Sequence, residues 1–429
     1  MSKLCIYKVY VHNKHMFFIN QSLRGAPMAN QRPNFSGSIV FLKADMNVPT
    51  DKSTGKILDI HRIMDGINAV KWCFSNKAHA VITISHQGRN KEETLKNHMP
   101  IFESYFPNRV KFIPHLSDLP NAVKNSKAGD ILLLENIRSL DEEKDYDDVT
   151  QTMLYKTLKE VETITNKKIV YAKDDLSVCH RKDLSVYGLP KQLKSEGYQI
   201  IAGQLIKNEL IRAKISKDKM KNNKIICVWG GGKFDDYLDL FEPFITKYNS
   251  IILTSGPLSL LMLKAMGKNI GENESLFGIN GEIVEKSAEL MGKFGSKIIL
   301  PKDYYVENSK GKELVNSNNI AGLVVDIGPE TVKMYKKMLS RNPQSIIIGN
   351  GPLGQYEKLE NAKGTIQVYM EAFNPLNKHF IVGGGGDFNT MMDILGFKNY
   401  MRSSGGKSFL KLLVFGTLPG LEPLELSID

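Results

Sequence analysis

The chain has 429 residues, a formal net charge of +11 and 42% hydrophobic residues. This length predicts two or three domains of roughly 150 residues each. Since no apolar run approaches the roughly 18 residues that span a bilayer, we expect no membrane insertion. The charge favours an anionic ligand, but the densest Lys run, residues 214–224, has no interleaved aromatics, which argues against nucleic acid as a partner.

The four cysteines, Cys5, Cys73, Cys179 and Cys227, form no CxxC pair. Neither a zinc knuckle nor a redox motif is indicated, and a reducing, cytoplasmic compartment fits. We expect residues 1–35 to be an N-terminal extension. The first acidic residue is Asp45, and an acid-poor basic leader is also typical of organelle targeting. A disordered extension or a later start is favoured over targeting.

From residue 38 onward, strand-like apolar runs alternate with segments of helical period. The first block has five such runs: IVFLKADMN, AVITISHQGR, VKFIPH, ILLLENIR and IVYAKDD. Helices are expected over 62–73, near 118–126 and near 149–166, with an acidic loop over 141–148. Repeated βα alternation predicts a parallel sheet covered by helices on both faces.

The stretch 187–215 follows, and its second half reads as a long helix that no strand interrupts. Six more runs come after it: IICVWGGGK, IILTSGP, IILPKD, VVDIGP, SIIIGNGP and FIVGGGGD. The predicted fold is α/β, with two doubly wound, Rossmann-like parallel-sheet domains joined by a hinge helix. We expect the first domain over 36–196, the second over 197–408, and a tail over 409–429 that packs back toward the first.

Most runs end in polar or glycine-rich residues, and ligands of open parallel sheets bind at the C-terminal ends of the strands. In the first block, the residues at or just beyond these ends are Asp45, Asn47, Arg62, His86, Arg89, Arg138, His180 and Arg181. Guanidinium groups grip phosphate or carboxylate through two hydrogen bonds, so the set fits a multiply charged anion. A surface ion pair explains one arginine, but not the collection at one edge.

The second block is rich in glycine instead. Gly230 to Lys233 resembles a phosphate cradle, and 349–354 satisfies GxGxxG, a weak signal because Pro352 suits a turn. Gly383 to Gly386 precede Asp387, a carboxylate that could hold Mg²⁺ on a nucleotide. Gly405-Gly406 open a helix that could face an anion. Each cluster alone could be a tight turn; together they predict a nucleotide site opposite the anion site, with hinge closure for phosphoryl transfer.

The motifs in chain order resemble those of phosphoglycerate kinases from about Ser38 to Gly420. They are KADMNVP, LDIHRI, SHQGR, LLLENIR, YAKDDLSVCHR, AGQLIKNEL, WGGGK, DIGPET, GNGPLGQYE, IVGGGGD and SSGGKS…LPG. The resemblance implies reversible Mg²⁺-dependent phosphoryl transfer between ATP and 3-phosphoglycerate, giving ADP and 1,3-bisphosphoglycerate. It further implies a monomeric, cytoplasmic, hinge-bending enzyme of glycolysis.

The resemblance also implies roles for individual residues. The catalytic set is Arg62, Lys233, Gly405 and Gly406. The substrate-binding set is Asp45, Asn47, Arg62, His86, Gln87, Gly88, Arg89, Arg138 and Arg181. The nucleotide-binding set is Gly231, Gly232, Lys233, Asn350, Pro352, Glu357, Gly385, Gly386 and Asp387, with Asp387 reaching the metal through the Mg-nucleotide.

The chain departs from this pattern mainly in its nucleotide half. Tyr237 stands where the family has a second phosphate-bridging Lys, and Phe388 where it has a small hydroxyl residue. Other departures are Lys43 for Arg, Ser177 for Gly, Val324 for Gly, Thr254-Ser255-Gly256-Pro257 for GGGM, and Lys407 for the third Gly of the helix start. Losing one phosphate-clamping cation typically costs on the order of 10²–10³ in rate.

Two alternatives to an active kinase follow. One is a catalytically impaired or inactive relative that binds the acid or a protein partner, since Tyr237 removes a charge from the nucleotide half. The other is an NAD-dependent oxidoreductase that uses 349–354, which leaves the arginine cluster unexplained. For an active enzyme, we expect Lys407 to supply the positive charge that Tyr237 lacks.

Overall fold

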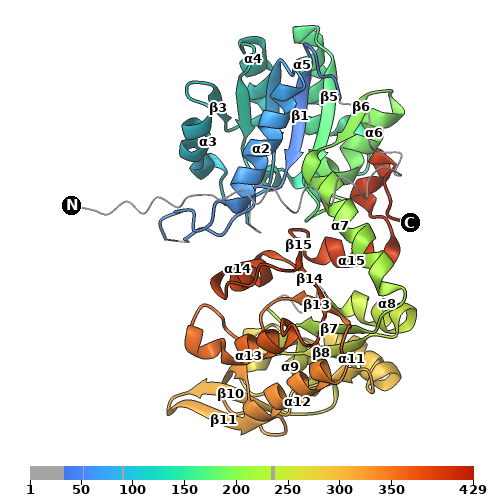
Figure 1. Ribbon diagram of the computed structural model, residues 1–429. Coiled ribbons are helices and arrows are strands. Elements are labelled where there is room, and N and C mark those ends of the chain that lie inside the picture. Colours follow the sequence, from blue (N-terminus) through green and yellow to red (C-terminus); the bar gives the residue numbers. More distant parts are fainter. Residues whose placement is uncertain (1–32, 52, 89–90, 233–236) are drawn as a thin grey trace, which may run out of the picture.

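The computed structural model describes residues 33–51, 53–88, 91–232 and 237–429 and shows two lobes stacked end to end (Figure 1). The first lobe contains a six-stranded sheet of order β3-β4-β2-β1-β5-β6, in which every pairing is parallel. Its strands are β1 (Ile39–Ala44), β2 (Ala80–Ile84), β3 (Val110–Ile113), β4 (Ile131–Leu134), β5 (Ile169–Asp174) and β6 (Gln199–Ala202).

Helices cover both faces of this sheet. They are α2 (His61–Ser75), α3 (Met99–Tyr105), α4 (Leu119–Lys124), α5 (Met153–Thr165) and α6 (Leu189–Ser195). Side chains alternate along β1: Val40 packs in one apolar cluster with Ile67 of α2, and Phe41 packs in the other with Leu158 of α5. Burial on both faces explains why the strands are continuous apolar runs, and the helices expected over 62–73, 118–126 and 149–166 are confirmed.

A strand interrupts the stretch that we expected to connect the lobes without one. Residues 199–202 form β6, which pairs with β5 and completes the first sheet. The connecting helix α7 (Gln204–Met220) begins only after it. The first sheet therefore extends past residue 196, where the sequence placed the end of the first domain, and α7 bridges the lobes (Figure 1).

The second lobe is also built on a parallel six-stranded sheet, of order β15-β14-β13-β7-β8-β9. Its strands are β7 (Ile225–Trp229), β8 (Ile251–Thr254), β9 (Ile298–Ile299), β13 (Ile346–Asn350), β14 (Phe380–Gly384) and β15 (Met401–Ser403). Its helices are α8 (Leu238–Tyr248), α9 (Gly256–Ala265), α10 (Asn273–Leu276), α11 (Gly281–Phe294), α12 (Pro329–Ser340), α13 (Lys363–Ala372), α14 (Gly386–Ile394) and α15 (Lys407–Phe415). The α/β prediction of two parallel-sheet domains is confirmed.

One expected parallel strand belongs elsewhere. The run VVDIGP forms β12 (Leu323–Ile327), which pairs antiparallel with β10 (Asp303–Asn308) in a separate sheet of order β11-β10-β12. The third strand, β11 (Gly311–Asn316), joins β10 through a tight turn. The small sheet packs beside the second lobe, at the bottom of Figure 1.

The last residues return to the first lobe. After α15, a 3₁₀ segment over Pro419–Leu424 contacts α6 and β6. The amide of Gly420 donates to the carbonyl of Cys179 at 2.8 Å, and Lys194 pairs with Glu425 at 2.8 Å. Within the described residues, no helix is both long and apolar enough to cross a membrane.

Candidate active site

The first group of expected site residues lies where β1 ends. Asp45 follows β1 and is buried, while Arg62 lies in the first turn of α2. Nη1 of Arg62 contacts Oδ1 and Oδ2 of Asp45 at 3.3 and 3.2 Å and the carbonyl oxygen of Asn47 at 3.4 Å. The Arg62 side chain is 24% exposed, so its guanidinium group is held in place and is still accessible to an anion.

The loop after β2 is anchored to the loop after β1. Oδ1 of Asn47 accepts from the amide of Gly88 at 2.8 Å. The Gln87 side chain donates through Nε2 to the carbonyl of Val48 at 2.6 Å and accepts through Oε1 from its amide at 3.3 Å. Both ends of the Gln87 carboxamide are thus occupied, and this side chain holds the two loops together.

Asn136, which was not among the expected site residues, joins the β2 and β4 loops. Its Oδ1 accepts from the amides of Gln87 and Arg138 at 3.1 and 3.2 Å. Its Nδ2 donates to the carbonyls of Gln87 and Glu93 at 2.9 and 2.7 Å. Its place two residues beyond the end of β4 was a signal available in the sequence, because the other site residues occupy equivalent strand ends.

Positive charge surrounds His86, which is almost fully buried. The pKa of His86 is held well below its usual range, first by burial and then by the positive charges of Lys43, Arg138, Arg62 and Arg181. The imidazole is therefore neutral near pH 7. Arg138 is itself buried and donates to the carbonyl of Gly88. The described structure therefore brings the expected acid-binding residues to one edge of the first sheet; Arg89 lies outside the described residues.

Beneath this edge lies a buried triad formed by Lys43, Lys173 and Asp175. Lys43 and Lys173 are register partners on β1 and β5. Their Nζ atoms lie 3.1 and 2.8 Å from the two carboxylate oxygens of Asp175, and all three side chains are at most 1% exposed. The triad contains two ammonium groups and one carboxylate, so it carries a net positive charge beneath the strand ends. Because the buried surroundings have low polarisability, the field of this charge acts strongly on a bound anion.

A buried carboxyl next to this site gives stability a pH dependence. Burial raises the pKa of Glu143 from 4.5 to about 7, although Ser185 bonds its oxygens at 3.0 and 2.6 Å. Between these pH values the unfolded chain has released a proton that the folded chain keeps, so stability falls as pH rises, by up to about 3 kcal/mol for this group.

We therefore expect Glu143→Gln to flatten the decline in unfolding free energy between pH 4.5 and 7, measured by urea denaturation. The slope should fall only in part, because burial also raises the pKa of Asp174 to about 7 and those of Asp65 and Asp326 to about 6. Glu160→Gln, at an exposed position of α5, is the control. A slope as steep in Glu143→Gln as in the control would contradict the assignment.

The two lobes meet at the segment that precedes α15. Nη2 of Arg62 lies 3.5 Å from the carbonyl oxygen of Ser404, directly before Gly405-Gly406. Gly406 has φ +50°, a conformation that favours glycine, and caps α15. The expected catalytic residues Arg62, Gly405 and Gly406 are thus brought together from different lobes.

Two further side chains hold this junction, and sequence reasoning did not assign a role to either. Glu209 of α7 is buried and accepts from the hydroxyl of Ser403 at 2.6 Å and the amide of Ser404 at 3.2 Å. The hydroxyl of Ser408 contacts Nδ1 of His180 at 2.6 Å and donates to the carbonyl of Ser177 at 2.8 Å. Only the assembled fold shows that these residues, more than 190 positions apart, face one another.

The expected nucleotide loops lie at the C-terminal edge of the second sheet. A side chain on Gly351 would approach the carbonyl oxygen of Gly230 to 2.3 Å, so the loops after β7 and β13 touch only because both positions are glycine. Nearby, Gly385 approaches Asn350 and Gly406. The structure therefore gathers Gly231, Pro352, Asn350, Gly385 and Gly406; Lys233 lies outside the described residues.

The side chain of Phe388 points into the core of the second lobe. It is fully buried in the apolar cluster beneath β13 and β14, and its ring meets Tyr369 and Tyr400 edge to face. A Cβ added to Gly349 or Gly383 would lie 2.5 or 2.1 Å from the ring. The aromatic ring at this position is therefore a packing feature of the second lobe, and the hydroxyl of the family pattern is absent.

Asp387 lies in the first turn of α14 and is exposed, as is Glu357 after the β13 loop. Burial, followed by the charges of Asp387 and Glu357, raises the pKa of Tyr356 to about 12, so this phenol stays protonated beside the carboxylates. No cluster of three or more metal-binding side chains occurs among the described residues. A single carboxylate fits a Mg²⁺ ion that is carried largely by nucleotide phosphates.

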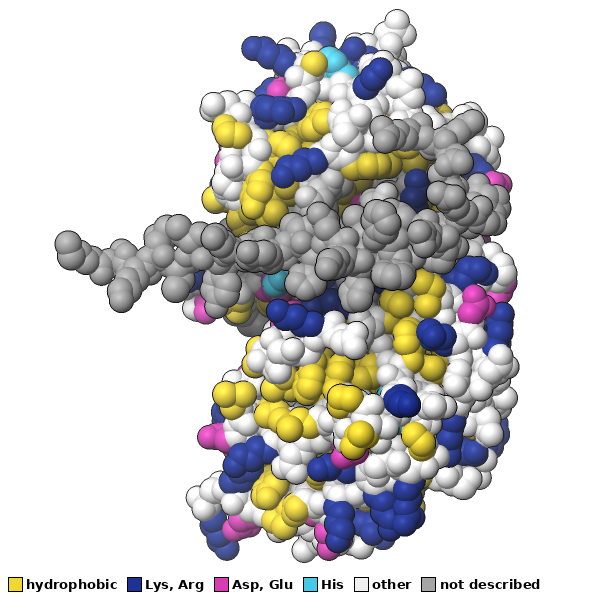
Figure 2. Space-filling view, viewed as in Figure 1, with side chains coloured by type: hydrophobic (Ala, Val, Ile, Leu, Met, Phe, Trp, Pro, Cys, Tyr) yellow, Lys and Arg dark blue, Asp and Glu magenta, His cyan; other side chains and the backbone are white. Residues whose placement is uncertain are grey.

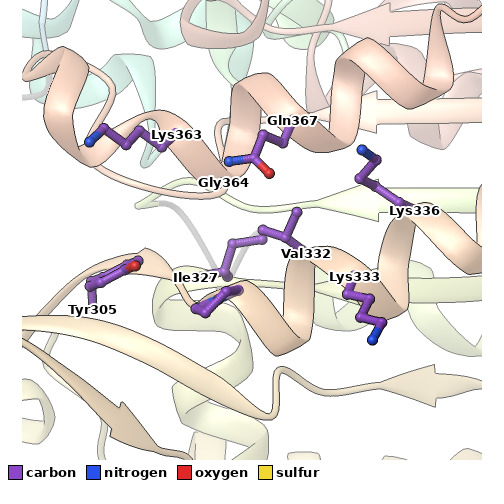
Figure 3. Close-up of a pocket in the computed structure, with 9 residues that line it drawn as sticks. Tyr305, Ile327, Val332, Lys333, Lys336, Lys363, Gly364 and Gln367 are labelled. Atoms are coloured by element: carbon purple, nitrogen blue, oxygen red, sulfur yellow. The ribbon is translucent and has the colours of Figure 1, made fainter.

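A separate pocket lies between α12 and α13, with a volume of about 290 Å³ (Figure 3). None of the expected site residues lines it. Three lysines line it, Lys333, Lys336 and Lys363, and the side-chain nitrogens of Lys333 and Lys363 point away from each other (Figure 3). On the face shown in Figure 2, Lys and Arg side chains are likewise scattered over both lobes.

Comparison with known proteins decides the family. The family model described as phosphoglycerate kinase matches residues 31–414. The chain belongs to the phosphoglycerate kinase family. The curated phosphoglycerate kinase of Thermoplasma acidophilum is 27% identical over 407 residues, covering 91% of this chain and 96% of that protein. That of Methanococcus maripaludis is 29% identical over 419 residues, covering 92% and 96%.

Solved phosphoglycerate kinases have the same fold. The crystal structure from Pyrococcus horikoshii OT3 has a TM-score of 0.74 and 24% identity, covering 91% of this chain and 97% of that one. The structure from Coxiella burnetii has a TM-score of 0.64 and 22% identity. Membership of the phosphoglycerate kinase family confirms the resemblance found in the sequence and assigns the chain kinase activity, a phosphotransferase function; the reading as an inactive binding protein is not favoured.

Proposed function

We propose that the chain transfers a phosphoryl group reversibly between MgATP and the carboxylate of 3-phosphoglycerate, as a cytoplasmic monomer in glycolysis. The observation that carries this proposal is the junction between the lobes. There Arg62, anchored to Asp45 in the anion-binding lobe, meets Ser404 beside Gly405-Gly406 of the glycine-rich lobe. A phosphoryl group that moves between the two clefts would pass this guanidinium.

Each half of the site contributes a different interaction. The neutral imidazole of His86 and the guanidinium groups of Arg138 and Arg181 would bind the phosphate of the acid, while Asp45 and Asn47 would bind its hydroxyl. Arg62 would stabilise the charge of the phosphoryl group in flight, which is where preorganised cations lower a barrier most. Closing the lobes would exclude water.

In the second lobe, Asn350 and the backbone amides of the loops at Gly231, Gly385 and Gly406 would face the nucleotide phosphates. Lys233 would contact a phosphate, and Glu357 a ribose hydroxyl. Asp387 would hold Mg²⁺ on the nucleotide. When bound, that ion neutralises phosphate charge.

The function is tested by a coupled assay of the purified full chain with 3-phosphoglycerate and MgATP. We expect turnover that needs both substrates and stops when EDTA removes Mg²⁺. Binding of 3-phosphoglycerate without turnover and without measurable MgATP affinity would instead favour the impaired relative.

Lys407 is expected to supply part of the charge that Tyr237 does not. Lys407 is the first residue of α15 and directly follows Gly406. The pKa of Asp239 is lowered by Lys286 and Lys411, and to a smaller extent by the charge of Lys407. Lys407→Ala should lower kcat at least about tenfold, since a cation near the transferring phosphate would be lost. Lys411→Ala, one turn further along α15 and 3.8 Å from Asp239, is the matched control. Equal turnover in the two variants would show that Lys407 does not supply the charge that Tyr237 lacks.

A further inference from the structure

Tyr237 lies between the ends of two neighbouring strands of the second sheet. Trp229 ends β7, Asn350 ends β13, and the two are register partners. Tyr237, the residue before α8, is 7% exposed, and its ring lies 5.6 Å from that of Trp229. Its hydroxyl donates to Oδ1 of Asn350 at 2.9 Å. The phenol is therefore fixed by packing on one side and by a hydrogen bond on the other.

The other half of the Asn350 carboxamide has no acceptor among the described residues. Asn350 is 4% exposed, and its Nδ2 makes no hydrogen bond with any residue that the structure describes. Buried donors of native proteins are nearly always paired, because an unpaired one is costly. The Nδ2 group of Asn350, unpaired within the described part of the chain, lies beside the glycine loops at Gly230, Gly351 and Gly385. It is therefore suited to donate a hydrogen bond to an acceptor atom of a bound ligand.

The orientation of the carboxamide decides what this ligand can be. An asparagine side chain rotated by 180° would present its oxygen, an acceptor only, in place of the NH₂ group. A phosphate oxygen needs the NH₂ group. In the structure the phenol O–H of Tyr237 donates to the carbonyl end of the carboxamide, and this hydrogen bond leaves the NH₂ end for the ligand.

We propose that Tyr237 is a positioning residue for the nucleotide: it orients Asn350 so that Nδ2 donates to a nucleotide phosphate. This inference rests on the proposed assignment of Asn350 as a nucleotide ligand. It explains how a neutral side chain serves at a position where the family pattern has a lysine. Tyr237 contributes to nucleotide binding by orienting the side chain of Asn350, and not by supplying a charge.

The test measures MgADP affinity of the full-length chain by titration calorimetry. Tyr237→Phe keeps the ring against Trp229 and removes the hydroxyl, and it should weaken MgADP binding about five- to tenfold. The KM for 3-phosphoglycerate should stay within about twofold of the unmodified chain. Asn350→Asp, which keeps the shape but replaces the NH₂ group by an oxygen, should weaken MgADP binding more strongly.

A double-mutant cycle separates positioning from a general loss of structure. In the Asn350→Ala background, adding Tyr237→Phe should cause no further loss of MgADP affinity. Tyr248→Phe is the matched control: it lies at the other end of α8, its hydroxyl donates to the carbonyl of Leu413 at 2.7 Å, and its loss should leave MgADP affinity unchanged.

Two results would overturn the inference, and they are distinguishable. If Asn350→Ala weakens MgADP binding but Tyr237→Phe does not, or if the Tyr237→Phe loss persists in the Asn350→Ala background, the positioning role is wrong while the nucleotide site stands. If neither Asn350 variant weakens MgADP binding, the assignment of Asn350 as a ligand fails and the positioning role fails with it.

Discussion

Arg62→Ala is expected to lower kcat by about 10³-fold while raising the KM for either substrate only a few-fold. The reason is geometric: Arg62 is anchored by Asp45 in one lobe and reaches the carbonyl of Ser404 in the other. A cation at the passage between two clefts acts on the group that moves, and removing an interaction made mainly in the transition state lowers kcat. Steady-state kinetics with each substrate varied in turn measure the effect.

Two variants control this result. Arg62→Lys keeps the positive charge but loses the planar fork, so it should recover only part of the lost rate. Arg341→Ala removes an exposed arginine at the end of α12 and should leave kcat unchanged. A large rise in KM with an unchanged kcat would demote Arg62 to a residue that only binds substrate.

That the candidate acid-binding residues lie at one edge of the first sheet could be predicted from the sequence for a physical reason. Parallel strands that are buried on both faces form unmistakable apolar runs, and their C-terminal ends must meet at one edge. Asp45, His86 and Arg138 could therefore be placed together without a structure. The support that Asn136 and Glu209 give could not, because it depends on which loops face each other after folding.

The errors in the fold have an equally specific cause. The run that became β12 has the same apolar composition as the parallel strands, so composition could not show that it pairs antiparallel with β10. Strand β6 is only four residues long and mostly half-buried, and it precedes a helix of seventeen residues. Although three of its four residues are apolar, so short a strand gives almost no signal next to such a helix.

Phe388 shows the limit of reading a substitution from its position in a motif. The residue follows Asp387, so sequence reasoning interprets its replacement of a small hydroxyl residue as a change in the nucleotide site. Helix α14 turns successive side chains in different directions, and while Asp387 is exposed, Phe388 points into the core beneath Gly349 and Gly383. The aromatic ring and the two strand glycines fit one another, so their sizes must be considered together.

Phe388→Ala is accordingly expected to destabilise the protein by about 3–5 kcal/mol, the usual cost of emptying a fully buried phenylalanine site. The loss should be large because β13 and β14 carry glycines beside the ring and have no side chains there to fill the cavity. Urea denaturation measures it, with Phe415→Ala as control, since Phe415 is 53% exposed and its removal should cost under about 0.5 kcal/mol.

The same variant separates the packing role of Phe388 from a role in the nucleotide site. At a temperature where both proteins are folded, the KM for ATP should agree within about twofold between Phe388→Ala and the unmodified chain. If the variant is instead as stable as the Phe415→Ala control and binds ATP more tightly, Phe388 obstructs the nucleotide and does not belong to the core. A destabilised variant with unchanged ATP affinity places the effect in the core, and the charge that Tyr237 does not supply then remains the main departure of this lobe.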